Sequence, residues 1–179
     1  MKIVIINCAE SQSSHEYFTM LTKNGFIQAD ELSAVLQDDT GSLKPDIIYA
    51  SPFIRAIQTI YPYCIDNDTK VRLECSLYPV LKQDSTEYYT DHKTKLPSHF
   101  RYLVPIVDRD YNTELFHTNV KGAETDIDVN NRIKPFLYNL KKRYSDTDKT
   151  VLIVTHIDTI PYMLEYICEL GVPVIDIGL

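Results

Sequence analysis

The stretch DIIYASPFIRAIQT (46–59) places a strand, a turn and the start of a helix within a few residues of each other. The apolar run at 46–50 predicts a buried strand. Ser51 and Pro52 then predict a helix with a serine N-cap and with proline at its first position. Apolar side chains recur at helical spacing after them. A buried strand that leads directly into a helix is typical of a parallel α/β sheet.

The alternation of strands and helices continues on both sides of this stretch. Further apolar runs predict strands at 2–6, 71–74 and 150–155, and an edge strand within 172–177. The run at 150–155, TVLIVT, is the most apolar of these, which predicts a central place in the sheet. The pattern as a whole predicts a three-layer α/β/α sandwich with a mainly parallel sheet.

The remaining helices are predicted between these strands. One follows a turn at 23–25, one spans 123–144, and one covers 158–170. Pro135 lies within the second of these and predicts a kink or a split. The residues expected on buried faces are Phe26, Ala29, Leu32, Val35 and Leu36 in the first helix and Ile127, Ile133, Phe136, Leu137 and Leu140 in the long one.

The length of 179 residues suits a single domain over 1–179, with an irregular, tyrosine-rich insertion at about 76–121. A net charge of −7 offers no general attraction to nucleic acid or to an anionic membrane. The four cysteines form no CxxC pair and lack zinc-ligand spacing, which is typical of reduced thiols. No apolar run reaches the length of a membrane span. We therefore expect an intracellular protein, cytoplasmic or nuclear, without a metal or other cofactor and without direct contact to nucleic acid or membrane.

Polar side chains follow three predicted strands at the point where each strand ends. Asn7 and Cys8 follow the first strand, the segment 51–55 follows the second, and His156 follows the central one. Because parallel strands end at the same edge of a sheet, where ligands bind in open α/β folds, we expect these residues on one rim.

Arg55 is the most informative of these residues. A cation in the first turn of a helix is electrostatically unfavourable unless an anion binds there. Two other interpretations stay open, namely an Arg55 that reaches a neighbouring carboxylate and a His156 that is only a buried structural histidine. The two residues on one rim together favour an anion site.

Several segments resemble the histidine phosphatase (phosphoglycerate mutase-like) superfamily. ASPFIRAIQT is similar to its SSPLxRAxQT motif, VLIVTHIDTI to its second-histidine segment, and LTKNGFIQADELSAVL to its LTxxGxxQAxxLAxxL helix. GAETDIDVNNRIKPFL resembles the start of the helix that precedes the last strand. VRLECSLYPVL and IVDRDY are most similar to the eukaryotic ubiquitin-associated and SH3-domain phosphatases. The resemblance implies a phosphoglycerate mutase-like fold.

The resemblance also implies a site that works through a phosphohistidine, with a phosphate-binding arginine, a nucleophilic histidine and a general acid. The RHGE motif of the family falls on Asn7, Cys8, Ala9 and Glu10, so the first arginine and the nucleophile are replaced. The second arginine and the second histidine are retained as Arg55 and His156. The position of the acid falls on Pro79, and the nearby Glu74 and Glu87 do not occupy it. No catalytic residue is therefore expected, and the implied phosphate-binding set is Arg55, His156, Cys8, Asn7 and Ser11, with Ser14 as a further candidate.

These replacements predict a pseudophosphatase that acts as a protein-interaction or phospholigand-binding module, with a weakly held phosphate or phospho-ligand. The alternative is an active phosphatase on phosphate monoesters that uses Cys8 or His156 in an unorthodox mechanism. Against Cys8 stands the absence of the C-x5-R loop of cysteine phosphatases, because the sixth residue after it is Ser14.

A third hypothesis is a subunit of a larger assembly, with a protein partner or an oligomer. The candidate surface is the tyrosine-rich segment, since tyrosine is favoured in the cores of interfaces. The other interpretation of these tyrosines is a cap over the sheet and a lid over the pocket. They are Tyr78, Tyr88, Tyr89, Tyr102 and Tyr111.

Overall fold

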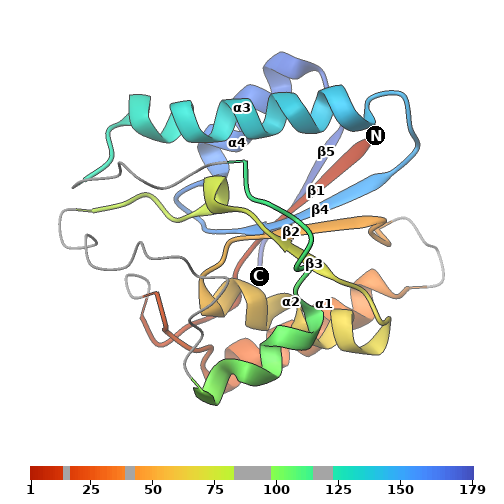
Figure 1. Cartoon of the computed structure of the whole chain (residues 1–179), viewed down its shortest axis with the longest axis vertical. Helices are drawn as coiled ribbons and strands as arrows, with labels where there is room; N and C mark the ends of the chain where they lie inside the picture. The colour runs from red at the N-terminus through yellow and green to blue at the C-terminus, as the bar shows by residue number, and fades with distance from the viewer. Residues whose placement is uncertain (14–16, 39–42, 83–97, 115–122) are drawn as a thin grey trace.

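The computed structural model describes residues 1–13, 17–38, 43–82, 98–114 and 123–179. Its centre is a sheet of five strands, all parallel, in the order β3-β2-β4-β1-β5 (Figure 1). The strands are β1 (Lys2–Asn7), β2 (Ile47–Ala50), β3 (Val71–Leu73), β4 (Thr150–Thr155) and β5 (Val174–Ile177). As predicted, the strand at 150–155 is central and the strand after residue 172 lies at an edge.

Two pairs of helices cover the two faces of this sheet (Figure 1). Helices α1 (Lys23–Leu36) and α2 (Ile54–Asp66) pack together on one face. Helices α3 (Asp126–Tyr144) and α4 (Ile160–Leu170) pack together on the other. The three-layer α/β/α sandwich predicted from the sequence is therefore confirmed.

Each strand contributes alternate side chains to the two layers of the core, as the period of a strand requires. In β1, Val4 and Ile6 join the cluster beneath α1 and α2, whereas Ile3 and Ile5 join the cluster beneath α3 and α4. The central β4 is buried along its whole length. Burial on both faces explains why this strand is the most apolar run in the sequence.

The four predicted helix starts differ from the observed ones by a few residues, with α3 beginning at Asp126 and α4 at Ile160, and two of the differences have a clear physical reason. Ser51 is not the N-cap of α2, which begins at Ile54 after Phe53 and has no side-chain cap. The Ser51 hydroxyl instead contacts His156 across the sheet edge. Helix α1 begins at Lys23, before the predicted turn has ended, because the Thr22 side chain accepts a hydrogen bond from the Gly25 amide.

The buried faces of α1 and α3 are narrower than predicted. Phe26 and Val35 are exposed because they flank the buried stripe that Ala29, Leu32 and Leu36 form in α1. Ile127 is 71% exposed because it lies on the side of α3 opposite to the buried residues. Pro135 neither splits nor ends α3, which runs as one helix to Tyr144.

The predicted insertion at 76–121 lies partly outside the described residues, which leave out 83–97 and 115–122. Its described part includes the 3₁₀ helix η2 (Ser98–Ile106), which packs against α2. The 3₁₀ helix η1 (Cys75–Leu77) lies at the start of this segment. Within the described ranges, no helix is long and apolar enough to cross a membrane.

The tyrosines of this segment differ in exposure. Tyr78 is buried, Tyr111 is half-buried, and Tyr102 is 40% exposed. Tyr88 and Tyr89 lie outside the described residues. Of the described tyrosines of this segment, Tyr102 is therefore the most exposed.

Candidate functional site

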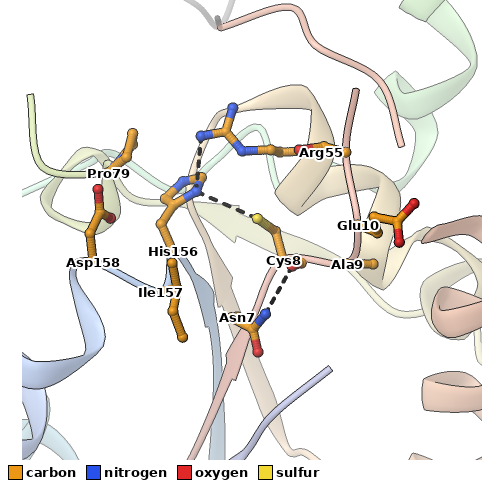
Figure 2. A pocket seen from close by; sticks show the side chains of 10 residues that line it. Asn7, Cys8, Ala9, Glu10, Arg55, Pro79, His156, Ile157 and Asp158 are labelled. Carbon is orange, nitrogen blue, oxygen red and sulfur yellow. Dashed lines mark hydrogen bonds between the residues drawn. The ribbon is translucent and has the colours of Figure 1, made fainter. Parts of the chain in front are cut away.

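A cavity of about 200 Å³ lies at the carboxyl edge of the sheet, where β1 and β4 end (Figure 2). At its volume in liquid water, roughly six water molecules would fill this space. The cavity is therefore large enough for a phosphate group with a short substituent. It is lined by Asn7, Cys8, Ala9, Glu10, Ser11, Arg55, Pro79, His156, Ile157 and Asp158.

The sheet itself brings the predicted rim residues together. Asn7 pairs with Thr155 at the end of the β1–β4 ladder. The Cys8 amide continues that ladder by donating to the Thr155 carbonyl over 2.8 Å. On the other side of β4, the Ser51 amide donates to the Val154 carbonyl over 2.9 Å. The segments after three strands thus converge on one edge.

His156 is buried between Ser51 and Arg55. Its Nδ1 lies 3.1 Å from Nη2 of Arg55, and its Nε2 lies 2.9 Å from the Ser51 hydroxyl. A guanidinium can only donate, so Nδ1 must accept, and Nε2 then carries the proton that is donated to Ser51. Burial, together with the charges of Arg55 and Arg132, holds the pKa of His156 well below its usual range. The ring is therefore neutral.

Arg55 supplies a buried positive charge to the cavity. Its side chain lies in the first turn of α2 and is 2% exposed. The guanidinium carbon lies 4.7 Å from the centre of the Phe53 ring. Burial lowers the pKa of Arg55, but an arginine remains protonated in proteins. A buried cation at the amino end of a helix is suited to an anion.

Cys8 lies on the other side of His156 Nδ1, with its sulfur 3.6 Å away (Figure 2). Burial raises the pKa of the Cys8 thiol, and the nearby Arg55 charge opposes this only in part. At neutral pH the group is therefore a thiol. Since Nδ1 offers a single lone pair, the thiol and Arg55 compete for the same acceptor.

Asn7 and Ser11 line the cavity, but their polar groups are engaged by the backbone. The Asn7 amide donates to the Cys8 carbonyl over 3.1 Å and accepts from the Leu179 amide over 3.0 Å. The Ser11 hydroxyl donates to the Ser13 carbonyl over 3.0 Å. Ser14 lies outside the described residues.

Pro79 reaches the cavity, and its ring has no proton to donate. Its carbonyl accepts a hydrogen bond from Arg132, which also forms a buried ion pair with Glu124. Glu74 does not line the cavity. It is fully buried and accepts hydrogen bonds from the side chains of Ser76, Tyr111 and Thr113 and from the amides of Ser76 and Glu114. Glu87 lies outside the described residues.

Two carboxylates also line the cavity, and the sequence reasoning assigned a role to neither. The Glu10 carboxylate accepts hydrogen bonds from Thr22 over 2.6 Å and from Asn24 over 3.1 Å. Asp158 is half-buried and lies beside Pro79 (Figure 2). Its position two residues after His156, on the same strand-end loop, was the signal that could have revealed it. In the described part of the chain, no three potential metal ligands gather into a metal site.

The loop after β1 is held by residues outside the cavity. The Ala9 amide donates to the Thr59 hydroxyl over 3.0 Å, and the Glu10 amide donates to the Gln28 side chain over 2.8 Å. The backbone of α1 approaches so closely at Gly25 that a Cβ there would lie 2.0 Å from the Glu10 carbonyl oxygen. This wall of the cavity is therefore firmly placed.

The sequence and the geometry agree with a known family. Its model, the histidine phosphatase superfamily (branch 1), matches residues 12–176. The chain belongs to the histidine phosphatase superfamily. No curated protein matches the chain.

Several solved histidine phosphatase structures have the same fold. The ecdysone phosphate phosphatase of Bombyx mori, in complex with tungstate, is 15% identical with a TM-score of 0.70, over 93% of this chain and 77% of that one. A mycobacterial glucosyl-3-phosphoglycerate phosphatase, in complex with inorganic phosphate, is 20% identical with a TM-score of 0.60. The match covers 94% of this chain and 78% of that one. The alpha-ribazole phosphatase of Shigella flexneri is 22% identical with a TM-score of 0.63. The match covers 97% of this chain and 81% of that one. At these identities the likeness establishes the fold alone.

Proposed function

We propose that this member of the histidine phosphatase superfamily is catalytically degenerate and acts as a phospholigand-binding module. The observation that carries this proposal is the buried cation of Arg55 at a cavity whose nucleophile position holds the thiol of Cys8. The resemblance of the 71–81 segment further favours the ubiquitin-associated and SH3-domain phosphatases as the nearest subgroup.

Anion binding is supported by the donors around the cavity. Arg55 has five N–H donors in a fork that matches phosphate oxygens, and one of them now contacts His156. Its place in the first turn of α2 adds the positive end of a helix dipole. Two structures of similar fold are complexes with tungstate and with inorganic phosphate, which supports an oxyanion as the kind of ligand.

The loss of catalysis is supported by three positions. A protonated Cys8 is a poor nucleophile, since the thiolate is the reactive form. Pro79 cannot protonate a leaving group, and the loss of a general acid alone typically lowers a rate by a factor of ~10²–10⁴. Asn7 supplies no charge, and its amide is already bonded to the Cys8 and Leu179 backbone. We therefore expect turnover at or near background.

Two measurements on the same protein test this function. Hydrolysis of p-nitrophenyl phosphate from mild acid to neutral pH should be at background in the parent and in Cys8→Ala alike. Titration calorimetry with inorganic phosphate should give binding in the parent and at least a tenfold weaker affinity in Arg55→Ala. Turnover in the parent would contradict catalytic degeneracy, and phosphate binding unaffected by Arg55→Ala would contradict the assignment of the pocket.

One observation favours the alternative of an active phosphatase, namely the 3.6 Å between the Cys8 sulfur and His156 Nδ1. In this mechanism the thiol proton passes to Nδ1, the sulfur attacks phosphorus, and the P–O bond to the leaving group breaks. Water then hydrolyses the S–P bond to release phosphate. This alternative requires Arg55 to leave Nδ1, and it predicts activity that Cys8→Ala abolishes.

A protein partner is a further part of the proposal. Tyr102 is 40% exposed, its hydroxyl accepts a hydrogen bond from Gln58 over 2.7 Å, and its ring meets Tyr61 edge-on. An exposed aromatic ring held in place loses little entropy on binding, which suits an interface. Affinity capture of the tagged chain from native extract, compared with Tyr102→Ser, tests this role. Partners recovered equally by both proteins would count against this surface.

A further inference from the structure

The lining of the cavity carries an unusual balance of charge for a phosphate site. Among the lining residues that the structure describes, Arg55 is the one cation, whereas Glu10 and Asp158 are both carboxylates and His156 is neutral. A phosphate dianion at Arg55 would share the cavity with negative charge. A purely anionic ligand is therefore poorly matched to this lining.

The two carboxylates differ in what they face. Glu10 is exposed, and its two oxygens accept hydrogen bonds from Thr22 and Asn24. Asp158 is half-buried, and its charge acts on the two groups at the centre of the site, favouring the protonated forms of both Cys8 and Arg55. Asp158 is therefore the carboxylate whose charge a bound molecule would meet.

The described neighbours of Asp158 offer its charge little compensation. Pro79, beside it in Figure 2, has no side-chain donor, and Ile157 next to it in sequence is apolar and 73% exposed. The hydrogen bond that Asp158 receives from the Thr159 hydroxyl is long, at 3.4 Å. Arg132, the other cation near this end of the cavity, is neutralised by its buried ion pair with Glu124.

We propose that the ligand is a phosphate monoester that also carries a cationic group, with its phosphate at Arg55 and its cation at Asp158. A cavity of about 200 Å³ places both ends within one small molecule, and Pro79 and Ile157 offer apolar contact to the methylene groups between them. This inference rests on the proposed phospholigand-binding function and adds the chemical class of the ligand.

Three phosphate esters of similar size test the effect of the substituent's charge, because all three carry the same phosphate group. They are O-phosphoethanolamine, propyl phosphate and phosphoglycolate, which carry a cationic, a neutral and an anionic substituent. Calorimetry on the full chain should give affinities in that order, with about twofold to fivefold between the cationic and the neutral ester, as expected for a partly screened ion pair.

Matched variants assign this preference to Asp158. Asp158→Asn should bind propyl phosphate at least as tightly as the parent, because the substitution removes a negative charge from the cavity, and it should lose the preference for O-phosphoethanolamine. Glu10→Gln should keep the preference, because the Glu10 carboxylate is held by Thr22 and Asn24.

The outcomes separate this inference from the function on which it rests. Equal or tighter binding of propyl phosphate by the parent, or an unchanged preference in Asp158→Asn, would overturn the cationic ligand and leave the phosphate pocket standing. Failure of all three esters and of inorganic phosphate to bind would overturn both.

Discussion

Arg55 and His156 lie far apart in the chain, yet Nη2 of the arginine donates to Nδ1 of the histidine over 3.1 Å. The contact fixes the tautomer of His156, because Nδ1 must accept and Nε2 must then donate to Ser51. It also occupies the lone pair that the Cys8 thiol would need in order to lose its proton. One hydrogen bond thus fixes the protonation and the contacts of the three central groups together.

The neutral state of His156 predicts an acid-sensitive fold. Its pKa is lowered in the folded protein, whereas the unfolded chain binds the proton near pH 6.5, so acid favours the unfolded state. Between pH 7.5 and pH 5, the free energy of unfolding should fall by about 2 kcal/mol more in the parent than in His156→Gln. Urea unfolding at several pH values measures this. The exposed His99 provides the control, and a parent-like slope in His156→Gln would contradict a neutral buried ring.

The raised pKa of Cys8 predicts slow alkylation. Iodoacetamide reacts with the thiolate, whose fraction at neutral pH is small because burial raises the pKa of Cys8. At pH 7.5, mass spectrometry should find Cys8 labelled at least about tenfold more slowly than the exposed Cys168, with the rate rising steadily at higher pH. Rapid labelling of Cys8 at pH 6.5 would instead reveal a thiolate paired with a protonated His156, as the active alternative requires.

Gly25 predicts a sharp steric requirement in the first turns of α1. A Cβ at this position would lie 2.0 Å from the Glu10 carbonyl oxygen, which is backbone and cannot rotate away. Gly25→Ala should lower the free energy of unfolding by about 1–3 kcal/mol, despite the better helix propensity of alanine. Gly178→Ala, which meets nothing within 4 Å, is the matched control and should be neutral. A stable Gly25→Ala protein would mean that the loop after β1 can move.

We expect the stability of the protein to depend strongly on the carboxylate of Glu74. This buried carboxylate accepts hydrogen bonds from groups that lie far from it in the sequence, including the Tyr111 hydroxyl at 2.5 Å and the Glu114 amide at 3.0 Å. In Glu74→Gln an NH₂ group would face these donors, which should cost about 2–4 kcal/mol of stability in chemical denaturation. The exposed Glu165→Gln should change stability by less than about 0.5 kcal/mol. An equally small effect at Glu74 would show that the network is not important for stability.

Much of the fold was predictable because the segments that are buried in the structure are apolar in sequence. The strand at 150–155 is apolar on both faces since helices cover both sides of the sheet, and its central place followed from that. The rim position of Cys8, Arg55 and His156 followed from the parallel direction of the strands alone. Local signals failed where a distant contact competed, as at Ser51, whose hydroxyl contacts His156 rather than capping α2.

The chemistry of the site was only partly predictable for the same reason. The sequence identified Arg55 and His156, but it could not reveal that they bond to each other or that the Asn7 amide faces the Leu179 backbone. Asp158 has no motif of its own, and its relevance arises from the fold, which places it at the cavity beside Pro79. Such relationships depend on side-chain direction, which periodicity does not encode.

The residues that build the cavity wall are separate from those that decide its chemistry. Thr59, Gln28 and Gly25 hold the loop after β1 through its backbone, and none of these contacts depends on the side chains of Asn7, Cys8 or Pro79. Mutational drift at the reactive positions is therefore tolerated by the architecture in either direction. The side chains that face the cavity can therefore be exchanged without rebuilding the wall that gives the cavity its shape.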